Sequence, residues 1–509
     1  MPDLPPRPHT VPPQHLGALL DRLPGSRIDG DPMTVVTGVT HDSRLVRAGD
    51  LYIARAGEQS HGIDHVAAAI DAGAVAVLTD PASEDRAVEA HPAAVVVVPD
   101  PRAAMGPAAA WVYADPSAAL LVLGVTGTNG KTTTVYLLEA GLRTAGRRTG
   151  LVGTIETRVD GEAMASARTT PEATDLQALF ALMRERAVDA VAMEVSSHAL
   201  ALGRVDGITF DFAAFTNLSQ DHLDFHHDMA DYFAAKAQLF TPGHSRRAVV
   251  CIDDEWGREL AKTATVPVIT TGRTPDADWR RLDDVDAGAA GGQTRLVDPD
   301  GNHHEVACGL IGMVNLTNAA LAYVTLVAAG IDPDHARNGI ASLSSIPGRM
   351  EPIAAGQPYV VLVDYAHTPE AVATLLADAR RLTAPEGRVL VVIGCGGDRD
   401  RAKRPAMGAA AAIGSDLAIF TNDNPRSEDP HAIIAAMRAG LPAGSDVVVE
   451  PDRRSAIGLA VEQARAGDVV VVAGKGHEQG QEIAGTVIEF DDRVVVQAAI
   501  AADLAGSAR

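Results

Sequence analysis

The sequence lacks long apolar runs. No stretch reaches the roughly 18 uninterrupted apolar residues of a membrane span, and the first residues, MPDLPPRPHTVPPQH, lack the apolar segment of a signal peptide. Neither a span nor a secretory signal is predicted, so we expect a cytoplasmic protein. Proline stiffens this N-terminal stretch, and we expect residues 1–15 to be a disordered tail.

Cysteine and positive charge are also scarce. The three cysteines, Cys251, Cys308 and Cys395, lie too far apart in sequence for a zinc or redox pair, and they indicate reduced thiols rather than a disulfide framework. Lys and Arg number 43 against 66 Asp and Glu, a net charge of -23, which opposes binding to nucleic acid and to anionic membranes. An anionic small molecule must therefore be held by local clusters of donors.

The chain is long enough for several cores, with 509 residues of which 46% are hydrophobic. Strand-like and alanine-rich helical runs alternate over residues 16–117, which predicts a small α/β domain. A second region, 118–350, opens with the strand candidate ALLVLGV. In the third, 351–509, strands such as YVVLVDYA and RVLVVIG alternate with helices, which indicates a mostly parallel, Rossmann-like sheet.

The segment GVTGTNGKTTT, residues 124–134, lies between an apolar strand candidate and an amphipathic helix candidate. A glycine-rich turn at a helix N-terminus directs backbone N–H groups at phosphate, while Lys131 can reach the terminal phosphates and Thr132 can bind magnesium. Val125 stands where the common Walker spacing has a glycine. A glycine turn with a chance lysine is the alternative, and the strand-loop-helix context favours a nucleotide-phosphate loop.

Two further segments carry candidate metal ligands. Glu194 ends the apolar run AVAME and could bind the magnesium that bridges nucleotide phosphates, although strands often simply end in an exposed acid. His222 lies among acids and histidines in QDHLDFHHD. That cluster is compatible with a metal site or with a solvated polar loop, and a solvated loop is the commoner case.

Lys236, in DYFAAKAQLF, shares a helix face with Tyr232, Phe233, Leu239 and Phe240. The commoner case is a lysine stem on apolar surface with its amine in water. The alternative is a desolvated amine with a lowered pKa, which can add carbon dioxide. The resulting carbamate would be an oxygen ligand suited to magnesium.

The segment TNDNPRSEDP follows the strand candidate DLAIFT and contains one arginine, Arg426. Asn-Pro is a frequent turn opener, so a turn with a surface arginine is the commoner case. The alternative is a carboxylate clamp, since a planar guanidinium binds a carboxylate through two parallel N–H bonds.

The order of the segments GVTGTNGKTTT, EVSSHAL, NLSQDHLDFH, DYFAAKAQLF, GMVNLTNAALA, IPGRME, VDYAHTPEA and GKGHE resembles that of the Mur ligases over most of the chain. The resemblance implies three domains, namely a UDP-sugar-binding domain, a central ATPase and a Rossmann-like domain for the incoming amino acid. That family's phosphate loop has the form GTxGK[ST], which accounts for Val125.

The resemblance also implies the site residues. The ATP site would comprise Gly127, Thr128, Asn129, Gly130, Lys131, Thr132, Thr133, Asn315, Asn318, Arg349 and Asp364. The catalytic residues would be Lys131, Glu194, His222 and Lys236, and the metal ligands Thr132, Glu194, His222 and the carbamate of Lys236. The UDP-muramyl peptide would contact Ser43, Arg44, His61, Gly62, Thr169, Thr170, Ser196 and Arg204. The amino-acid site would comprise Arg399, Asp423, Asn424, Pro425, Arg426, Gly474 and Glu478.

The activity implied by the DNPR motif is ATP-dependent addition of meso-2,6-diaminopimelate to the D-glutamate of UDP-N-acetylmuramoyl-L-alanyl-D-glutamate, through an acyl phosphate. ATP, Mg²⁺ and a carbamylated Lys236 would be required, in a monomer with small-molecule substrates only. The alternatives are the L-lysine-adding counterpart, a folylpolyglutamate synthetase and a nucleotide-binding switch. HDSR, TTPE and DNPR together disfavour the folate enzyme, whereas the phosphate loop alone does not exclude a switch.

Overall fold

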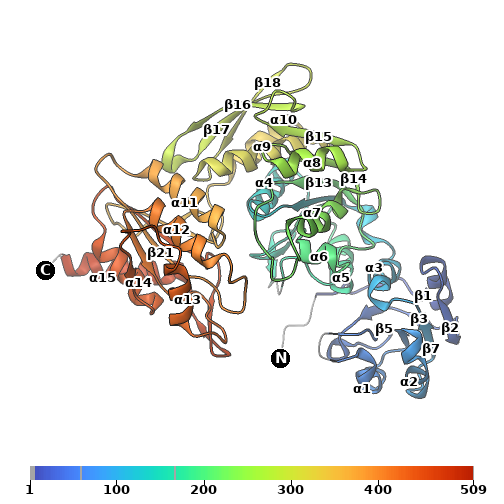
Figure 1. Ribbon diagram of the computed structural model, residues 1–509. Coiled ribbons are helices and arrows are strands. Elements are labelled where there is room, and N and C mark those ends of the chain that lie inside the picture. Colours follow the sequence, from blue (N-terminus) through green and yellow to red (C-terminus); the bar gives the residue numbers. More distant parts are fainter. Residues whose placement is uncertain (1–5, 58–59, 165–167, 508–509) are drawn as a thin grey trace.

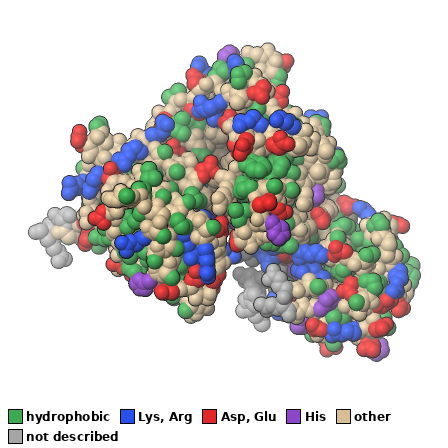
Figure 2. Space-filling model, viewed as in Figure 1, with side chains coloured by type: hydrophobic (Ala, Val, Ile, Leu, Met, Phe, Trp, Pro, Cys, Tyr) green, Lys and Arg blue, Asp and Glu red, His purple; other side chains and the backbone are tan. Residues whose placement is uncertain are grey.

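The computed structural model describes residues 6–57, 60–164 and 168–507. It confirms the predicted α/β class with three domains, and the N-terminal and C-terminal domains flank the central one (Figure 1). Lys and Arg side chains are interspersed with Asp and Glu over the face in Figure 2, so no broad basic surface appears there. No helix within the described ranges is long and apolar enough to cross a bilayer.

The N-terminal domain is built on a five-stranded sheet in the order β2-β7-β6-β5-β4, in which only β2 is antiparallel to its neighbour. Its strands and helices are β2 (Arg27–Gly30), β4 (Gly38–Thr40), β5 (Asp50–Ile53), β6 (Ala76–Thr79), β7 (Ala94–Val97), α1 (Val66–Asp71), α2 (Glu84–Glu89) and α3 (Pro101–Val112). Buried side chains of α3 share one hydrophobic cluster with Ala173, Ala178 and Ala181 of the central domain. This shared core fixes the two domains against each other.

The described part of the expected disordered tail is ordered instead. Arg7 donates to both carboxylate oxygens of Asp50 at 2.8 Å, and Asp50 is only 2% exposed. The backbone N–H groups of residues 9 and 10 donate to Glu185, and β1 (Gln14–His15) pairs with β3 (Val35–Val36). The prediction of disorder is therefore wrong for residues 6–15, because composition does not show these long-range partners; residues 1–5 lie outside the described residues.

The central domain contains an eleven-stranded sheet in the order β11-β10-β9-β12-β8-β13-β14-β15-β16-β17-β18, and neighbours are parallel from β9 through β16. Its strands are β8 (Leu121–Thr126), β9 (Thr149–Val152), β10 (Thr157–Val159), β11 (Glu162–Met164), β12 (Ala190–Glu194), β13 (Phe210–Phe215), β14 (Ser245–Cys251), β15 (Val268–Gly272), β16 (Trp279–Asp286), β17 (Gly292–Val297) and β18 (His303–Cys308). Because parallel strands end at one edge, the loops after β8, β12 and β13 meet there.

Helices cover both faces of this sheet. On one face the core contains side chains of α4 (Lys131–Thr144), α9 (Met313–Ala328) and α10 (Pro333–Ser342). The core on the other face contains side chains of α5 (Ala173–Glu185), α6 (Ser197–Ala201), α7 (Met229–Ala237) and α8 (Glu255–Thr263). Burial on both faces explains why the sequence gives near-continuous apolar strands rather than alternation.

The C-terminal domain has a six-stranded sheet in the order β19-β20-β24-β21-β22-β23, parallel except for β19. Its strands are β19 (Glu351–Pro352), β20 (Val360–Asp364), β21 (Val389–Ile393), β22 (Leu417–Phe420), β23 (Val448–Val449) and β24 (Val469–Ala473), with a separate hairpin of β25 (Gly480–Ile483) and β26 (Thr486–Glu489). Its helices are α11 (Pro369–Leu382), α12 (Arg404–Gly414), α13 (Pro430–Arg438), α14 (Arg453–Gln463) and α15 (Asp492–Ser507).

A buried ion pair supports the loops at one edge of this C-terminal sheet. Arg453 and Asp492 are both 0% exposed, and the guanidinium donates to both carboxylate oxygens at 2.8 and 2.7 Å. The same guanidinium donates to the carbonyl oxygens of Asn422 and Ala473. It therefore connects the segment after β22 with the end of β24, two of the three places from which the predicted amino-acid site is built.

Candidate functional site

The glycine-rich loop joins β8 to the N-terminus of α4, as the sequence predicts. Gly127 and Gly130 have φ angles of 147° and 85°. A Cβ atom would lie 1.9 Å from Oγ1 of Thr216 at the first position and 2.5 Å from Oδ1 of Asn318 at the second. Only glycine fits both places, and the loop leads into a helix N-terminus that favours an anion such as phosphate.

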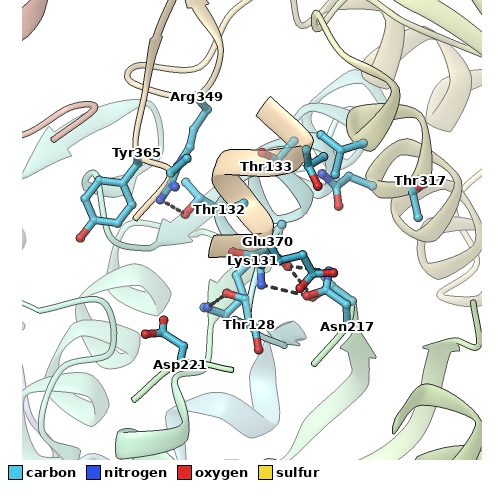
Figure 3. Close-up of a pocket in the computed structure, with 18 of the residues that line it drawn as sticks. Thr128, Lys131, Thr132, Thr133, Asn217, Asp221, Thr317, Arg349, Tyr365 and Glu370 are labelled. Atoms are coloured by element: carbon cyan, nitrogen blue, oxygen red, sulfur yellow. Dashed lines mark hydrogen bonds between the residues drawn. The ribbon is translucent and has the colours of Figure 1, made fainter. Parts of the chain in front are cut away.

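Glu194 ends β12 next to this loop, because β12 runs parallel to β8. Its Oε1 accepts hydrogen bonds from Oγ1 of Thr132 at 3.0 Å and from the backbone N–H of Thr154 at 2.8 Å, and its Oε2 accepts from Oγ1 of Thr154 at 3.1 Å. Arg349 donates to the Thr132 hydroxyl at 3.0 Å (Figure 3). A carboxylate, a hydroxyl and a guanidinium thus meet where nucleotide phosphates would lie.

Two lysine amines approach the same carbonyl oxygen. Nζ of Lys131 donates to the carbonyl oxygens of Gly127 and Thr128 at 2.9 and 2.8 Å, and Nζ of Lys236 donates to that of Gly127 at 2.8 Å. Lys236 is 1% exposed, and its amine lies 4.6 Å from the centre of the Tyr232 ring. Within the described residues, neither lysine pairs with a carboxylate.

Burial lowers the pKa of both lysines. For Lys236 the pKa lies well below its ordinary value, first because the amine is desolvated and then because the positive charge of Lys131 is close. For Lys131 burial is again the main cause, opposed by Glu194 and Asp221. The desolvated environment of Lys236 thus favours the neutral form of its amine.

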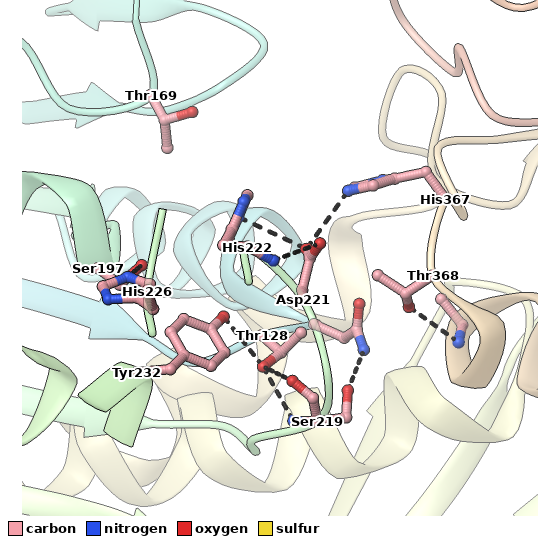
Figure 4. A network of polar contacts seen from close by, with 12 residues as sticks. Thr128, Thr169, Ser197, Ser219, Asp221, His222, His226, Tyr232, His367 and Thr368 are labelled. Carbon is pink, nitrogen blue, oxygen red and sulfur yellow. Dashed lines mark hydrogen bonds and ion pairs between the residues drawn. The ribbon is translucent and has the colours of Figure 1, made fainter. Parts of the chain in front are cut away.

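Asp221 connects the central and C-terminal domains (Figure 4). Its carboxylate lies 3.5 Å from Nε2 of His222, 3.6 Å from Nε2 of His367 and 3.4 Å from Nζ of Lys403. Burial opposes ionisation, but the contact with His367 and the other positive neighbours hold the pKa of Asp221 well below its usual range. Burial lowers the pKa of His222 to about 3, so its imidazole is neutral, the form that binds metal.

These groups line a cavity of about 460 Å³ between the central and C-terminal domains. Asn315 and Asn318 extend from α9 and are hydrogen bonded to each other at 3.1 Å, while Asn315 also donates to the carbonyl oxygen of residue 311. Asp364, at the end of β20, accepts the N–H groups of Met350 and Ala366, and burial raises its pKa. The residues expected for ATP that line the cavity are Thr128, Asn129, Gly130, Lys131, Thr132, Thr133, Asn315, Asn318, Arg349 and Asp364.

Four residues expected for the muramyl peptide lie around the Glu194 end of the cavity. Oγ1 of Thr169 is 3.0 Å from that of Thr154, and Oγ1 of Thr170 donates to the Glu194 carbonyl oxygen and accepts the N–H of Ser196. Arg204 lies 2.9 Å from a carboxylate oxygen of Glu172, which Arg102 and Arg168 also contact. Three guanidiniums around one carboxylate leave positive charge next to the cavity, which suits an anionic substrate.

The four expected UDP residues lie in the N-terminal domain and do not line this cavity. Arg44 is exposed and pairs with Asp42, and Ser43 begins the short helical turn that Asp42 caps. Nε2 of His61 lies 2.9 Å from Asp80. At Gly62, a Cβ atom would come within 2.9 Å of the chain at residues 54 and 55. The structure thus places them in another domain from the phosphate loop.

The residues expected for the incoming amino acid form a second cluster, in the C-terminal domain. Nδ2 of Asn424 donates to Oε2 of Glu478 at 2.8 Å. Arg426 donates to the carbonyl oxygen of Gly397 at 2.7 Å, and its Nε lies 3.5 Å from Glu482. A Cβ atom at Gly474 would lie 2.6 Å from Oδ2 of Asp423.

The remaining two members frame this cluster. The carbonyl oxygen of Pro425 would lie 1.9 Å from a Cβ atom at Gly397, so the DNPR turn packs directly on the glycine-rich segment after β21. Arg399, in that segment, is exposed and makes no hydrogen bond or ion pair with the described residues. It is therefore free to reach a ligand.

Comparison with known proteins agrees with this geometry. Three family models match the chain: "Mur ligase family, catalytic domain" at residues 35–113, "Mur ligase middle domain" at 125–326 and "Mur ligase, glutamate ligase domain" at 348–476. A relative from Streptomyces coelicolor is 54% identical over 97% of this chain and 98% of its own length. The chain belongs to the Mur ligase family.

Relatives of this Mur ligase carry informative names. The Streptomyces coelicolor protein and one from Corynebacterium glutamicum, 46% identical over 90% of each chain, are named UDP-N-acetylmuramoyl-L-alanyl-D-glutamate–2,6-diaminopimelate ligase. A solved structure with that name has a TM-score of 0.66 and 32% identity, covering 97% of this chain and all of the other. Folylpolyglutamate synthase from Mycobacterium tuberculosis, at 21% identity and a TM-score of 0.60 over 79% of this chain and 95% of its own, shares the fold.

Several residues of the Mur ligase site were missed by sequence reasoning. Thr154 holds both oxygens of Glu194, Lys403 reaches Asp221 from the C-terminal domain, and Lys475 contacts Asn424 and Glu478. Lys475 lies in the motif GKGHE, from which the sequence predicts only Gly474 and Glu478 as members of the amino-acid site. Thr154 and Lys403 had no local signal.

We predict that Lys236→Met stabilises the protein by about 1–3 kcal/mol in buffer free of carbon dioxide, because it removes a buried amine that has no anionic partner. The pKa of Lys236 is lower in the folded protein than in the unfolded chain. The gain should therefore be present at pH 7 and shrink as pH rises towards about 10.4, the value for an unfolded lysine. Denaturant unfolding at several pH values measures it, and a loss of stability at pH 7 would contradict the prediction.

The matched control is Lys262→Met on α8. That lysine is 73% exposed, and its ion pair with Glu259, at 3.9 Å, is long and solvent-exposed. Its replacement should therefore change the unfolding free energy by less than about 0.5 kcal/mol at every pH.

Proposed function

We propose that this chain is the ATP-dependent ligase that adds meso-2,6-diaminopimelate to the D-glutamate of UDP-N-acetylmuramoyl-L-alanyl-D-glutamate, in peptidoglycan precursor synthesis. The observation that carries the substrate assignment is the presence of two groups in the loops at one edge of the C-terminal sheet: the Asn424–Glu478 hydrogen bond and the Arg426 guanidinium, which is held by the carbonyl oxygen of Gly397. Diaminopimelate has a second carboxylate and ammonium at its far end, and a guanidinium beside a carboxylate is complementary to both. The names of the relatives support the same assignment.

We assign the three binding tasks to the three domains, with bounds of 16–117 for the UDP-sugar, 118–350 for ATP and 351–509 for the amino acid. The sheets fall inside these bounds, in residues 27–97, 121–308 and 351–473. The cavity between the last two domains is where the chemistry would take place, because it contains the phosphate loop and opens between central and C-terminal residues.

The reaction needs an activated carboxyl group, since a carboxylate is a poor electrophile. The substrate carboxylate would attack the γ-phosphate of ATP to form an acyl phosphate, and the amine of diaminopimelate would then displace phosphate. Lys131 and the N–H groups of the loop would neutralise charge on the transferring phosphoryl group. Arg349, which lies over the Tyr365 ring and donates to Thr132, would fix the phosphates from the C-terminal side.

Magnesium fits the oxygen donors at the phosphate loop. Among the described residues no group of three or more His, Cys, Asp or Glu side chains could hold a metal ion alone. Magnesium commonly binds one or two carboxylates together with water and nucleotide phosphates, and Glu194 with the Thr132 hydroxyl at 3.0 Å matches that pattern. Glu194 and Thr132 would hold the ion, which would supply positive charge to the phosphates. Neutral His222 would supply a further ligand.

We also propose that Lys236 is carbamylated. Its amine is buried, has a lowered pKa and donates to the same carbonyl oxygen as Lys131, with no carboxylate of the described residues paired to it. The nitrogen would bond to the carbon of carbon dioxide and release one proton to solvent, which converts an uncompensated amine into an anion next to a cation. The carbamate oxygens would then be available to hold magnesium near the acyl phosphate.

One assay tests the proposed function. Phosphate release from ATP with magnesium and the UDP-muramyl dipeptide is expected with meso-diaminopimelate, and only weakly with L-lysine or no amino acid. Release with lysine but not diaminopimelate would assign the chain to the lysine-adding ligases. Phosphate release at the same rate with or without the dipeptide and either amino acid would indicate a nucleotide-binding switch.

Arg426→Ala should raise the KM for meso-diaminopimelate roughly thirtyfold, because losing one partner of a charge-assisted pair costs about 2 kcal/mol or more. The KM for ATP should stay within about twofold. Steady-state kinetics with each substrate varied in turn measures both constants. Arg438→Ala, an exposed arginine in the last turn of α13, is the matched control, and equal effects of Arg426→Ala on both constants would reduce this arginine to a turn residue.

Lys236→Ala should lower kcat about a hundredfold, the upper range for loss of a group that supports a metal site. Acetate or propionate should restore part of the activity, since a short carboxylate can occupy the space of the missing carbamate. Lys262→Ala should neither lose activity nor respond to acetate. Full activity of Lys236→Ala without added carboxylate or bicarbonate would rule out the carbamate.

A further inference from the structure

Lys475 is a buried lysine in the segment between β24 and the hairpin of β25 and β26. Its side chain is 0% exposed. Nζ donates to Oδ1 of Asn424 at 3.1 Å, to Oε2 of Glu478 at 3.0 Å and to the carbonyl oxygen of Gly480 at 2.6 Å. An ammonium has three N–H donors, so all of them are used inside the protein and none is left for a ligand.

These bonds determine how Asn424 is oriented. Its Oδ1 accepts from Lys475 and from the backbone N–H of Glu482 at 3.0 Å. With the oxygen held by two donors, the amide nitrogen must face the other way, and Nδ2 donates to Oε2 of Glu478 at 2.8 Å. The lysine thus selects one of the two orientations that an asparagine amide could take.

The same bonds leave Glu478 with one free oxygen. Oε2 accepts from both Lys475 and Asn424, whereas Oε1 accepts no hydrogen bond from the described residues. Glu478 is 32% exposed while Lys475 is fully buried, so the carboxylate lies between a buried cation and solvent. A single carboxylate oxygen is therefore presented outwards, in a fixed direction and on the side away from the lysine.

Burying an ammonium costs free energy because the group loses its hydration, and this cost must be offset by the hydrogen bonds that it makes inside the protein. Its partners belong to the amino-acid cluster: two are members of that cluster, and the third, Gly480, begins the strand that carries Glu482. Lys475 does not line the cavity that contains the phosphate loop. Its contacts therefore concern the amino acid and not the nucleotide.

We propose that Lys475 is a positioning residue for the amino-acid substrate: it orients Glu478 and Asn424 so that Oε1 of Glu478 meets the ammonium at the far end of that substrate. This inference rests on the proposed function for the identity of the amino acid. Lys475 does not touch the substrate, and it acts through the two side chains that do.

Lys475→Met tests this role, because methionine has a similar length and no donors. The KM for meso-diaminopimelate should rise about tenfold or more, the effect expected when a charged hydrogen-bond partner is lost, while the KM values for ATP and the UDP-muramyl dipeptide stay within about twofold. Lys262→Met, exposed on α8, is the matched control and should change none of them. A similar rise in all three KM values would overturn the proposal.

A double-mutant cycle separates positioning from general stability. If Lys475 acts through Glu478, then adding Lys475→Met to Glu478→Gln should raise the diaminopimelate KM by much less than the product of the two single effects. Multiplicative effects would show that the lysine acts independently of Glu478 and would overturn the proposal. Thermal unfolding and ADP binding of each variant verify the fold.

Should Lys475→Met lose its cooperative unfolding transition, Lys475→Arg carries the test. A guanidinium keeps the charge but cannot place its donors at the single point on which the three acceptors converge, so the same selective rise in KM is expected. An unchanged diaminopimelate KM in Lys475→Arg would overturn the proposal. Failure of the proposed function is distinguishable, because it would appear in the wild type as a preference for another amino acid, before any variant is made.

Discussion

Two buried amines that share one carbonyl oxygen impose the main constraint on this protein. Lys131 and Lys236 both donate to Gly127, and no carboxylate of the described residues pairs with either. Such an arrangement lowers both pKa values and is complete only when anions enter, which nucleotide phosphates and a carbamate would supply. These buried amines lower the local stability of the fold and favour the binding of anionic ligands, a combination that is common at functional sites.

The charges around the two buried amines also involve the C-terminal domain. The negative charge of Asp221 acts on both amines, yet its carboxylate contacts His367 and Lys403 of the other domain. Arg349, at the end of the central domain, donates to Thr132 of the same domain. Charges of the central site are therefore balanced partly from outside it, and separation of the two domains would leave both sides with uncompensated charge. These contacts tie the central site to the C-terminal domain.

Local patterns in the sequence predicted what depends on local geometry. The glycines and the lysine of the phosphate loop all lie in residues 124–131. The apolar face of the helix that contains Lys236 can likewise be recognised from the spacing of its apolar residues. What failed or was missed depends on distant partners: Thr154 reaches Glu194 across 40 positions, Lys475 reaches Asn424 across 51 and Lys403 reaches Asp221 across 182. The tail was predicted to be disordered for the same reason, since nothing near Arg7 reveals Asp50 as its partner.

Arg426 shows how the structure refines a specificity argument made from sequence. An arginine in an enzyme for lysine would be an unpaired buried cation only if nothing else neutralised it. Here Glu482 lies 3.5 Å away, the side chain is 24% exposed, and the backbone, at a φ of 50°, is hydrogen bonded on both sides to the β25 segment. The guanidinium is thus neutralised within the protein, and discrimination must come from the bonds that a ligand adds. A second carboxylate would gain parallel N–H bonds that lysine cannot form, and the backbone bonds to the β25 segment hold the residue that carries the guanidinium.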